Sequence, residues 1–124
     1  MAAPPKRFKF GWYGDGGLGE RLIQEIILGR KTATSCLAYE AEDAGIKEGD
    51  FLDLVDKRGH SHGTLVVTKI EIRLYGTFDE TLAAASGVSL EKMKEMTRFA
   101  NGREPWQDEE MRVVYFRVVS VAKR

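Results

Sequence analysis

Residues 18–35 decide the fold, and they read LGERLIQEIILGRKTATS. The apolar side chains at the start of this stretch recur at the i, i+4, i+5, i+8 and i+9 spacing of an amphipathic helix: Leu18, Leu22, Ile23, Ile26 and Ile27. Gly29 follows as a natural C-cap, so the pattern predicts a helix that ends there. Residues 30–35 are mostly polar or β-branched, which indicates that the chain turns from the helix into a strand.

Alternating and β-branched stretches on both sides of this segment predict a sheet. The expected strands lie at residues 8–12, 32–39, 51–55, 64–74 and 113–121. Five or six short strands are expected against only two or three helices, and the longer strands are adjacent in the sequence, which argues against a doubly wound sheet. The pattern therefore favours an α+β fold, a small mixed or antiparallel β-barrel with two or three helices on its rim.

Two polar residues mark the helices expected in the second half of the chain. Asp79 is suited to cap a short helix over residues 81–85, and Ser89 to cap a second one from Leu90 to about residue 99. A side-chain oxygen at such a position accepts a hydrogen bond from a backbone N–H that the first helical turn leaves unpaired.

Composition limits the classes of function. The chain has 124 residues and 43% hydrophobic content, which fits one domain over residues 6–124 after a disordered leader at residues 1–5. It carries 19 basic and 19 acidic residues, so it cannot coat duplex DNA or an anionic membrane by bulk charge. The lone Cys36 excludes an internal disulfide. A cytoplasmic protein, a monomer or weak homodimer, is expected.

Three short motifs are better explained by structure than by function. Gly14-x-Gly16-x-x-Gly19 matches the dinucleotide fingerprint, but the strand before it is aromatic and the chain is too short for the corresponding sheet. His60-Ser61-His62 lacks a third ligand nearby, so we expect a solvated turn and no metal. Cys36 has no adjacent base, which favours a buried thiol over a nucleophile.

The polar segment after the first helix combines a lysine with two threonines. Alternation along the entering strand places Thr32 and Thr34 on one side, and Lys31 joins them only if the turn rotates it. A lysine near apolar walls loses solvation, so its pKa falls and it can act as a base or bind phosphate. Such a base can activate a neighbouring threonine hydroxyl. The chemistry leaves two interpretations open, a functional site or a surface turn. Because Lys31 and Thr34 follow the helix cap and lie outside the apolar stripe, we expect their replacement to cost little stability.

These residues carry a resemblance to a known family. Residues 29–34, GRKTAT, match the motif G-x-K-x-x-T, and residues 47–50, KEGD, match an x-x-G-D turn. Residues 70–78 and 113–119 are similar to two later strands of the same family. Over residues 8–121 the chain thus resembles the ASCH family (activating-signal-cointegrator homology), small proteins with a PUA-like β-barrel.

The resemblance implies a cleft for RNA, nucleotides or modified nucleosides, and it implies no cofactor. Some members are amidohydrolases that remove the acetyl group from N4-acetylcytidine, and a related branch is reported as ribonuclease. In the amidohydrolases the motif lysine is the base and the motif threonine the nucleophile, roles that carry over to Lys31 and Thr34. The positions expected to bind the ligand around them are Gly29, Arg30, Thr32, Tyr39, Glu40 and Arg98.

Two departures from the family pattern bear on catalysis. The motif often continues to an arginine, where this chain has Cys36. By hand alignment, the family's assisting glutamate falls on Ser86, which cannot replace a carboxylate. Glu40 or Glu42 could take that role only if the fold brings one of them to the cleft. The sequence therefore supports two functions, a metal-independent hydrolase acting on an amide or on RNA, and a non-catalytic RNA-binding module.

Overall fold

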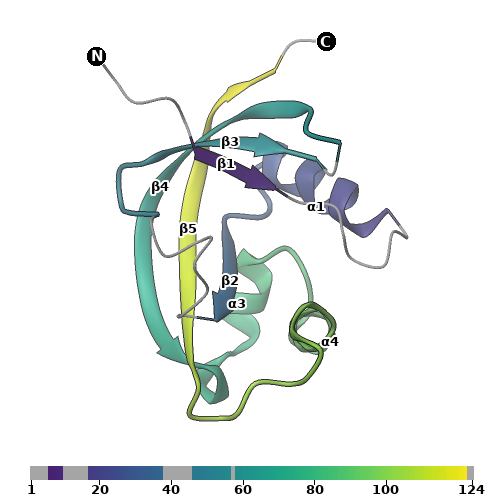
Figure 1. The fold of residues 1–124 in the computed structure, drawn as a ribbon, viewed down its shortest axis with the longest axis vertical. Coiled ribbons are helices and arrows are strands. Elements are labelled where there is room, and N and C mark those ends of the chain that lie inside the picture. The colour runs from purple at the N-terminus through teal and green to yellow at the C-terminus, as the bar shows by residue number, and fades with distance from the viewer. Residues whose placement is uncertain (1–5, 10–16, 38–45, 57, 123–124) are drawn as a thin grey trace.

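The computed structural model describes residues 6–9, 17–37, 46–56 and 58–122 (Figure 1). Within them, one sheet contains β1 (Lys6–Lys9), β2 (Ala33–Leu37), β3 (Phe51–Val55), β4 (Ser61–Leu74) and β5 (Glu110–Val121). The strand order is β1-β3-β4-β5-β2, in which β1 runs parallel to β3 and the other neighbours are antiparallel. The long strands β4 and β5 are the central pair, and they run most of the length of the molecule.

The helices of the described residues are α1 (Leu18–Ile27), α3 (Glu80–Ala85) and α4 (Leu90–Asn101), and a 3₁₀ helix, η1, spans Tyr75–Thr77. Both caps expected from the sequence are confirmed. The Asp79 carboxylate accepts a hydrogen bond from the Leu82 N–H at 2.9 Å, and the Ser89 hydroxyl accepts one from the Lys92 N–H at 3.1 Å.

Two apolar clusters form the core, one on each face of the sheet. The first cluster joins α1 to the sheet and consists of Leu22, Ile23, Ile26, Ile46, Leu52, Leu54, Leu65, Val67, Val114 and Phe116. The second lies with α3 and α4 and consists of Ala33, Tyr75, Phe78, Leu82, Ala83, Met93, Met111 and Val113. Consecutive residues of β5 enter different clusters, as the two-residue period of a strand requires: Val113 lies in the second cluster and Val114 in the first. Val88 packs against both clusters, so it lies where the two halves meet.

The α+β class, the mixed sheet and its three accompanying helices agree with the prediction, but the described strands do not close into a barrel. β1 and β2 are the two ends of the strand order. β3, which carries β1, pairs with residues 61–66 of β4, whereas β2 pairs with residues 111–115 of β5. Those two ladders lie at opposite ends of the central pair, so the described residues of β1 and β2 do not pair with each other.

Two sequence-based predictions concern residues outside the described ranges, namely the leader at residues 1–5 and the glycine motif beginning at Gly14. Among the helices that are described, none is both long and apolar enough to cross a membrane.

Candidate functional site

The site begins at the C-terminal end of α1, where Gly29 turns the chain. Gly29 has a φ of +80°, a left-handed conformation that glycine adopts without strain. Its N–H bonds to the Ile26 carbonyl at 2.9 Å, and the Arg30 N–H bonds to the Glu25 carbonyl at 2.9 Å. This is the Schellman pattern of hydrogen bonds, which ends a helix at a fixed geometry. The Lys31 N–H also bonds to the Glu25 carbonyl, so the backbone of the motif lysine is held directly by α1.

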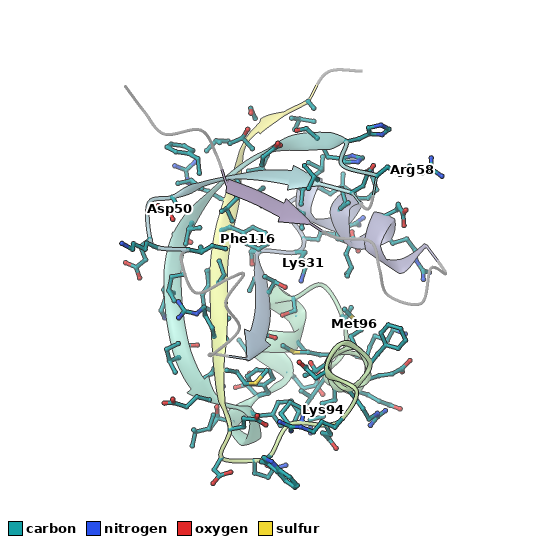
Figure 2. The ribbon with its side chains drawn as sticks, viewed as in Figure 1. Lys31, Asp50, Arg58, Lys94, Met96 and Phe116 are labelled. Atoms are coloured by element: carbon teal, nitrogen blue, oxygen red, sulfur yellow. The ribbon has the colours of Figure 1, made fainter. Side chains whose placement is uncertain are left out.

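Lys31 points inward from this turn and is buried, with 3% of its surface exposed. Its Nζ donates hydrogen bonds to the backbone carbonyl of Ala33 at 2.7 Å and to that of Ser86 at 3.0 Å. The side chain lies near the middle of the molecule, between the half that contains α1 and the half that contains α3 (Figure 2). The interpretation as a surface turn is therefore wrong for Lys31, because the side chain is buried against the end of α3. The sequence showed only that Lys31 lies outside the apolar stripe of α1, and it could not show this contact.

The end of α3 forms the other wall of the Lys31 recess. Gly87 has a φ of +83°, and a Cβ at this position would lie 3.2 Å from the Cβ of Lys31. The Gly87 N–H bonds to the Ala84 carbonyl and the Val88 N–H to the Ala83 carbonyl, a second Schellman pattern. The Ser86 carbonyl is one of those that the helix leaves unpaired, and the Lys31 Nζ satisfies it. Two helix C-termini thus meet around one lysine.

Burial lowers the pKa of Lys31 from 10.5 to about 7. The cause is desolvation, because an ammonium group away from water is destabilised relative to the neutral amine. The two carbonyl oxygens are neutral dipoles that accept hydrogen bonds from either form of the amine. Near neutral pH, Lys31 therefore exchanges its proton readily, which is the property required of a general base or acid.

The two motif threonines alternate with the buried Ala33 along the entering strand. Thr32 is exposed, and its backbone joins the two halves: its N–H bonds to the Ala85 carbonyl at 2.7 Å and its carbonyl accepts from the Phe116 N–H at 3.0 Å. Thr34 is half-buried and pairs in register with Val114, a member of the first apolar cluster. Within the described residues, no hydrogen bond joins the Thr34 hydroxyl to Lys31.

Of the remaining predicted site residues, Arg30 and Arg98 are exposed, and the others lie outside the described ranges. Arg30 is exposed, and its Nε lies 2.7 Å from the Glu25 carboxylate. Arg98 is exposed in the last turn of α4, with no hydrogen bond or ion pair to Lys31 in the described part of the chain. Tyr39, Glu40 and Glu42 lie outside the described residues.

Ser86, the residue aligned with the family glutamate, does lie beside Lys31. It presents its backbone carbonyl to the lysine, and its own hydroxyl is buried without a hydrogen-bond partner in the described structure. Position 36, where the family motif often has an arginine, pairs in register with Arg112 of β5. Sequence reasoning did not single out Arg112, although the alternation of residues 111–116 places it on the face opposite Met111 and Val113.

A second polar group lies at the β3–β4 hairpin, away from Lys31. The His62 Nε2 lies 3.0 Å from the Asp56 carboxylate, which also accepts hydrogen bonds from the backbone N–H groups of Arg58 and His60. These bonds lower the pKa of Asp56 to about 2, with the His62 contact as the largest cause. The expected solvated turn is right for His60, whose side chain is 74% exposed, and wrong for His62, at 17%, because β4 already begins at Ser61. Gln24 and Ile27 of α1 complete a hollow of about 690 Å³ there.

The fold of this chain is similar to that of several solved structures. No family model matches the chain, and no curated protein matches it. Protein EF3133 from Enterococcus faecalis, of the DUF984 family, has a TM-score of 0.75 at 26% identity, over 98% of this chain and 79% of that one. An ASCH domain from Lactobacillus crispatus has a TM-score of 0.75 at 20% identity, over 93% and 80% of the two chains. A mutant of the protein ZmASCH from Zymomonas mobilis has a TM-score of 0.62 at 11% identity, over 90% and 67%.

The chain has the fold of ASCH-domain proteins. The resemblance indicated by the motif at residues 29–34 is confirmed at the level of the fold. The motif lysine stands at the junction of the two halves of that fold.

Proposed function

We propose that this protein binds an RNA-derived nucleoside or nucleotide beside Lys31 and hydrolyses an amide on its base, with N4-acetylcytidine as the model substrate. The observation that carries the proposal is the burial of Lys31, which lowers its pKa to about 7. An exposed lysine is fully protonated at neutral pH and cannot accept a proton, whereas Lys31 can. The motif and the ASCH-like fold support the class of ligand.

In the proposed reaction, the neutral Lys31 Nζ takes the Thr34 hydroxyl proton while the oxygen attacks the acetyl carbonyl carbon. The proton passes to N4 of the leaving cytidine as the C–N bond breaks, which leaves an acetyl ester on Thr34. A water that gives its proton to the same amine then hydrolyses the ester, releases acetate and restores the hydroxyl. Thr34 has no hydrogen-bond partner among the described residues, so its hydroxyl is free to turn toward a bound substrate.

Acetate release from N4-acetylcytidine tests this proposal. The wild-type protein should release acetate, and the Lys31→Met and Thr34→Val variants should not. Thr34→Val should still bind the nucleoside within about tenfold of wild type, because one hydroxyl contact contributes about 1 kcal/mol. Thr68→Val, at an exposed position of β4, is the matched control and should turn over normally. A wild-type protein that releases no acetate, or a Lys31→Met variant that still does, contradicts the proposal.

A second candidate function, a non-catalytic RNA-binding module, is favoured by one observation. At the position of the family glutamate, Ser86 offers Lys31 a carbonyl and no carboxylate. Titration of short single-stranded RNA without turnover of N4-acetylcytidine would support this function. Since the net charge is zero, few phosphates can be neutralised at once, and the salt dependence should correspond to about one to three ion equivalents.

A further inference from the structure

Arg112 is a half-buried arginine that has no hydrogen bond and no ion pair in the described structure. Its Nε is fully shielded from solvent and lacks an acceptor. Burying part of a charged group without a partner is unfavourable, and arginines that are withdrawn from water are normally paired. The Nε–H of Arg112 is therefore a shielded donor that lacks an acceptor among the described residues.

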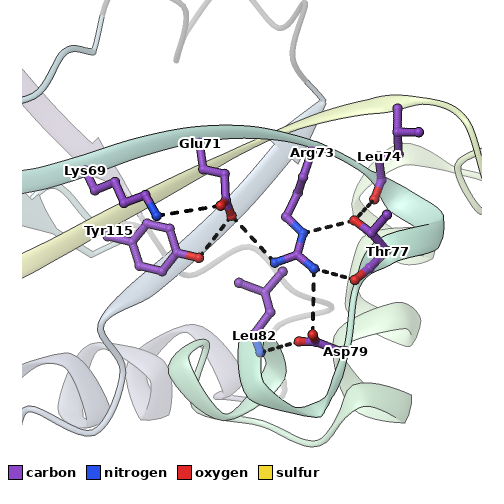
Figure 3. Close-up of polar contacts among 8 residues, drawn as sticks. All are labelled: Lys69, Glu71, Arg73, Leu74, Thr77, Asp79, Leu82 and Tyr115. Carbon is purple, nitrogen blue, oxygen red and sulfur yellow. Dashed lines mark hydrogen bonds and ion pairs between the residues drawn. The ribbon is translucent and has the colours of Figure 1, made fainter.

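Arg73, which lies across from β5 on β4, shows the usual solution. Its Nε donates to the Thr77 hydroxyl at 3.0 Å, and its guanidinium lies 3.5 Å from the Glu71 carboxylate and 3.8 Å from that of Asp79 (Figure 3). Arg73 pairs in register with Met111, and Arg112 pairs with the next residue of β4, Ile72. Adjacent arginines on opposite faces of the sheet thus differ completely in their partners.

The strand register places Arg112 on the face of the sheet that carries Thr34. Thr34 pairs with Val114, and Arg112 lies two residues before Val114 on β5, so the two are diagonal neighbours on one face. Diagonal neighbours on adjacent antiparallel strands lie about 7–8 Å apart, within reach of a long side chain. On one side of Arg112 lies β2, which is an end strand of the sheet. On the other side, its partner in register on β4 is Ile72, which is 47% exposed.

We propose that Arg112 binds the phosphate group of a nucleotide ligand whose base is held near Thr34 and Lys31; this inference rests on the proposed function. A guanidinium presents parallel N–H donors that match two oxygens of a phosphate, and such charge-assisted bonds are stronger than neutral ones. The buried Val114, two residues along β5 from Arg112, lowers the local polarity on this face, which strengthens the pairing. The preferred ligand is then a nucleotide, and the nucleoside binds more weakly.

The test compares N4-acetylcytidine with its 5′-monophosphate. The wild-type protein should bind the monophosphate about 10–100-fold more tightly, as expected for hydrogen bonds to a charged group. Arg112→Gln should reduce that preference to less than about threefold, and Arg112→Lys should keep part of it because the charge remains. Arg117→Gln, at an exposed position of the same strand, is the control and should keep the full preference.

The outcomes separate this inference from the proposed function. Equal binding of both ligands by the wild type, or an unchanged preference in Arg112→Gln, overturns the role of Arg112 even if acetate release continues. Arg112→Gln that loses the preference yet releases acetate from the nucleoside supports it. The NMR signal of the Arg112 Nε–H gives a second measurement, which does not depend on the variants folding. It should shift when the monophosphate is added but not with the nucleoside, and no shift with the monophosphate contradicts the inference.

Discussion

Lys31 and Arg73 are both basic residues withdrawn from water, and the partners described for them differ in charge. Lys31, at 3% exposure, bonds to two backbone carbonyls from different parts of the chain. Arg73 lies beside two carboxylates in a group that also includes Lys69 and Tyr115 (Figure 3). The two carbonyls beside Lys31 are neutral acceptors, whereas carboxylates favour the charged form of any base beside them. Burial lowers the pKa of Lys31 to about 7, whereas the Arg73 cluster holds β4 against η1 and α3.

Replacing the two cations should give the largest difference. Lys31→Ala removes the donors to two buried carbonyls and leaves a space beside Gly87. The small loss expected from the sequence is therefore replaced by an expected fall of about 2–4 kcal/mol in the free energy of unfolding. Arg73→Ala breaks contacts that are partly exposed and should cost about 1 kcal/mol. Urea unfolding of both variants measures this difference. Equal losses would show that Lys31 is no more embedded than Arg73.

The pH dependence of stability should carry the signature of Lys31. Its pKa is about 7 when folded and returns to about 10.5 on unfolding, so between these values the unfolded chain binds more protons. Stability should therefore rise with pH above 7, by at most about 1.4 kcal/mol per pH unit. Urea midpoints at pH 7, 8 and 9 measure it, below the range in which Tyr75, whose pKa is raised to about 12, adds its own effect.

Lys31→Met is the control for this profile, because it keeps an unbranched side chain only one atom shorter and removes the titrating group. Its stability should be nearly constant between pH 7 and 9. A wild-type profile as flat as that of the variant would mean that Lys31 keeps its proton in the folded protein.

Gly87→Ala should disturb the recess without touching a titratable group. Gly87 has a φ of +83°, and the Cβ of an alanine there would lie 3.2 Å from the Cβ of Lys31. We therefore expect the free energy of unfolding to fall by about 1–2 kcal/mol and acetate release to be reduced. Gly49→Ala is the matched control, since Gly49 has a φ of +88° and open space around it. It should carry the backbone strain alone and leave turnover unchanged. Equal effects of the two substitutions on turnover would argue against close packing around Lys31.

Glu71→Gln should have the smallest effect on stability, at most about 1 kcal/mol, because the Glu71 carboxylate is partly exposed. Its effect should appear in the pKa of Tyr115, which burial raises first and Glu71 raises further. Without the carboxylate, that pKa should fall toward its ordinary value while remaining above it. A ¹³C NMR titration of the tyrosine ring measures the change. The pKa of Lys31 should stay the same, and a shift there would show that the two regions are electrostatically coupled.

Local signals in the sequence were enough for much of the fold. The apolar period of residues 18–27, the glycine at position 29 and the caps at Asp79 and Ser89 each depend on neighbours within one or two turns of the chain. Such signals persist in the folded protein because the backbone groups that they satisfy are local. Closure of the sheet was predicted wrongly, since it depends on which ends of β4 and β5 the short strands join.

The chemistry of the site depended on contacts between distant segments. The sequence showed a lysine and two threonines after a helix, and it identified the motif to which they belong. Burial of Lys31 required the end of α3, fifty-five residues further on, to meet the end of α1. The partner of His62 and the isolation of Arg112 likewise follow from how strands and turns are assembled. A pKa is set by the solvent and charges around a group, and only the folded chain decides what those are.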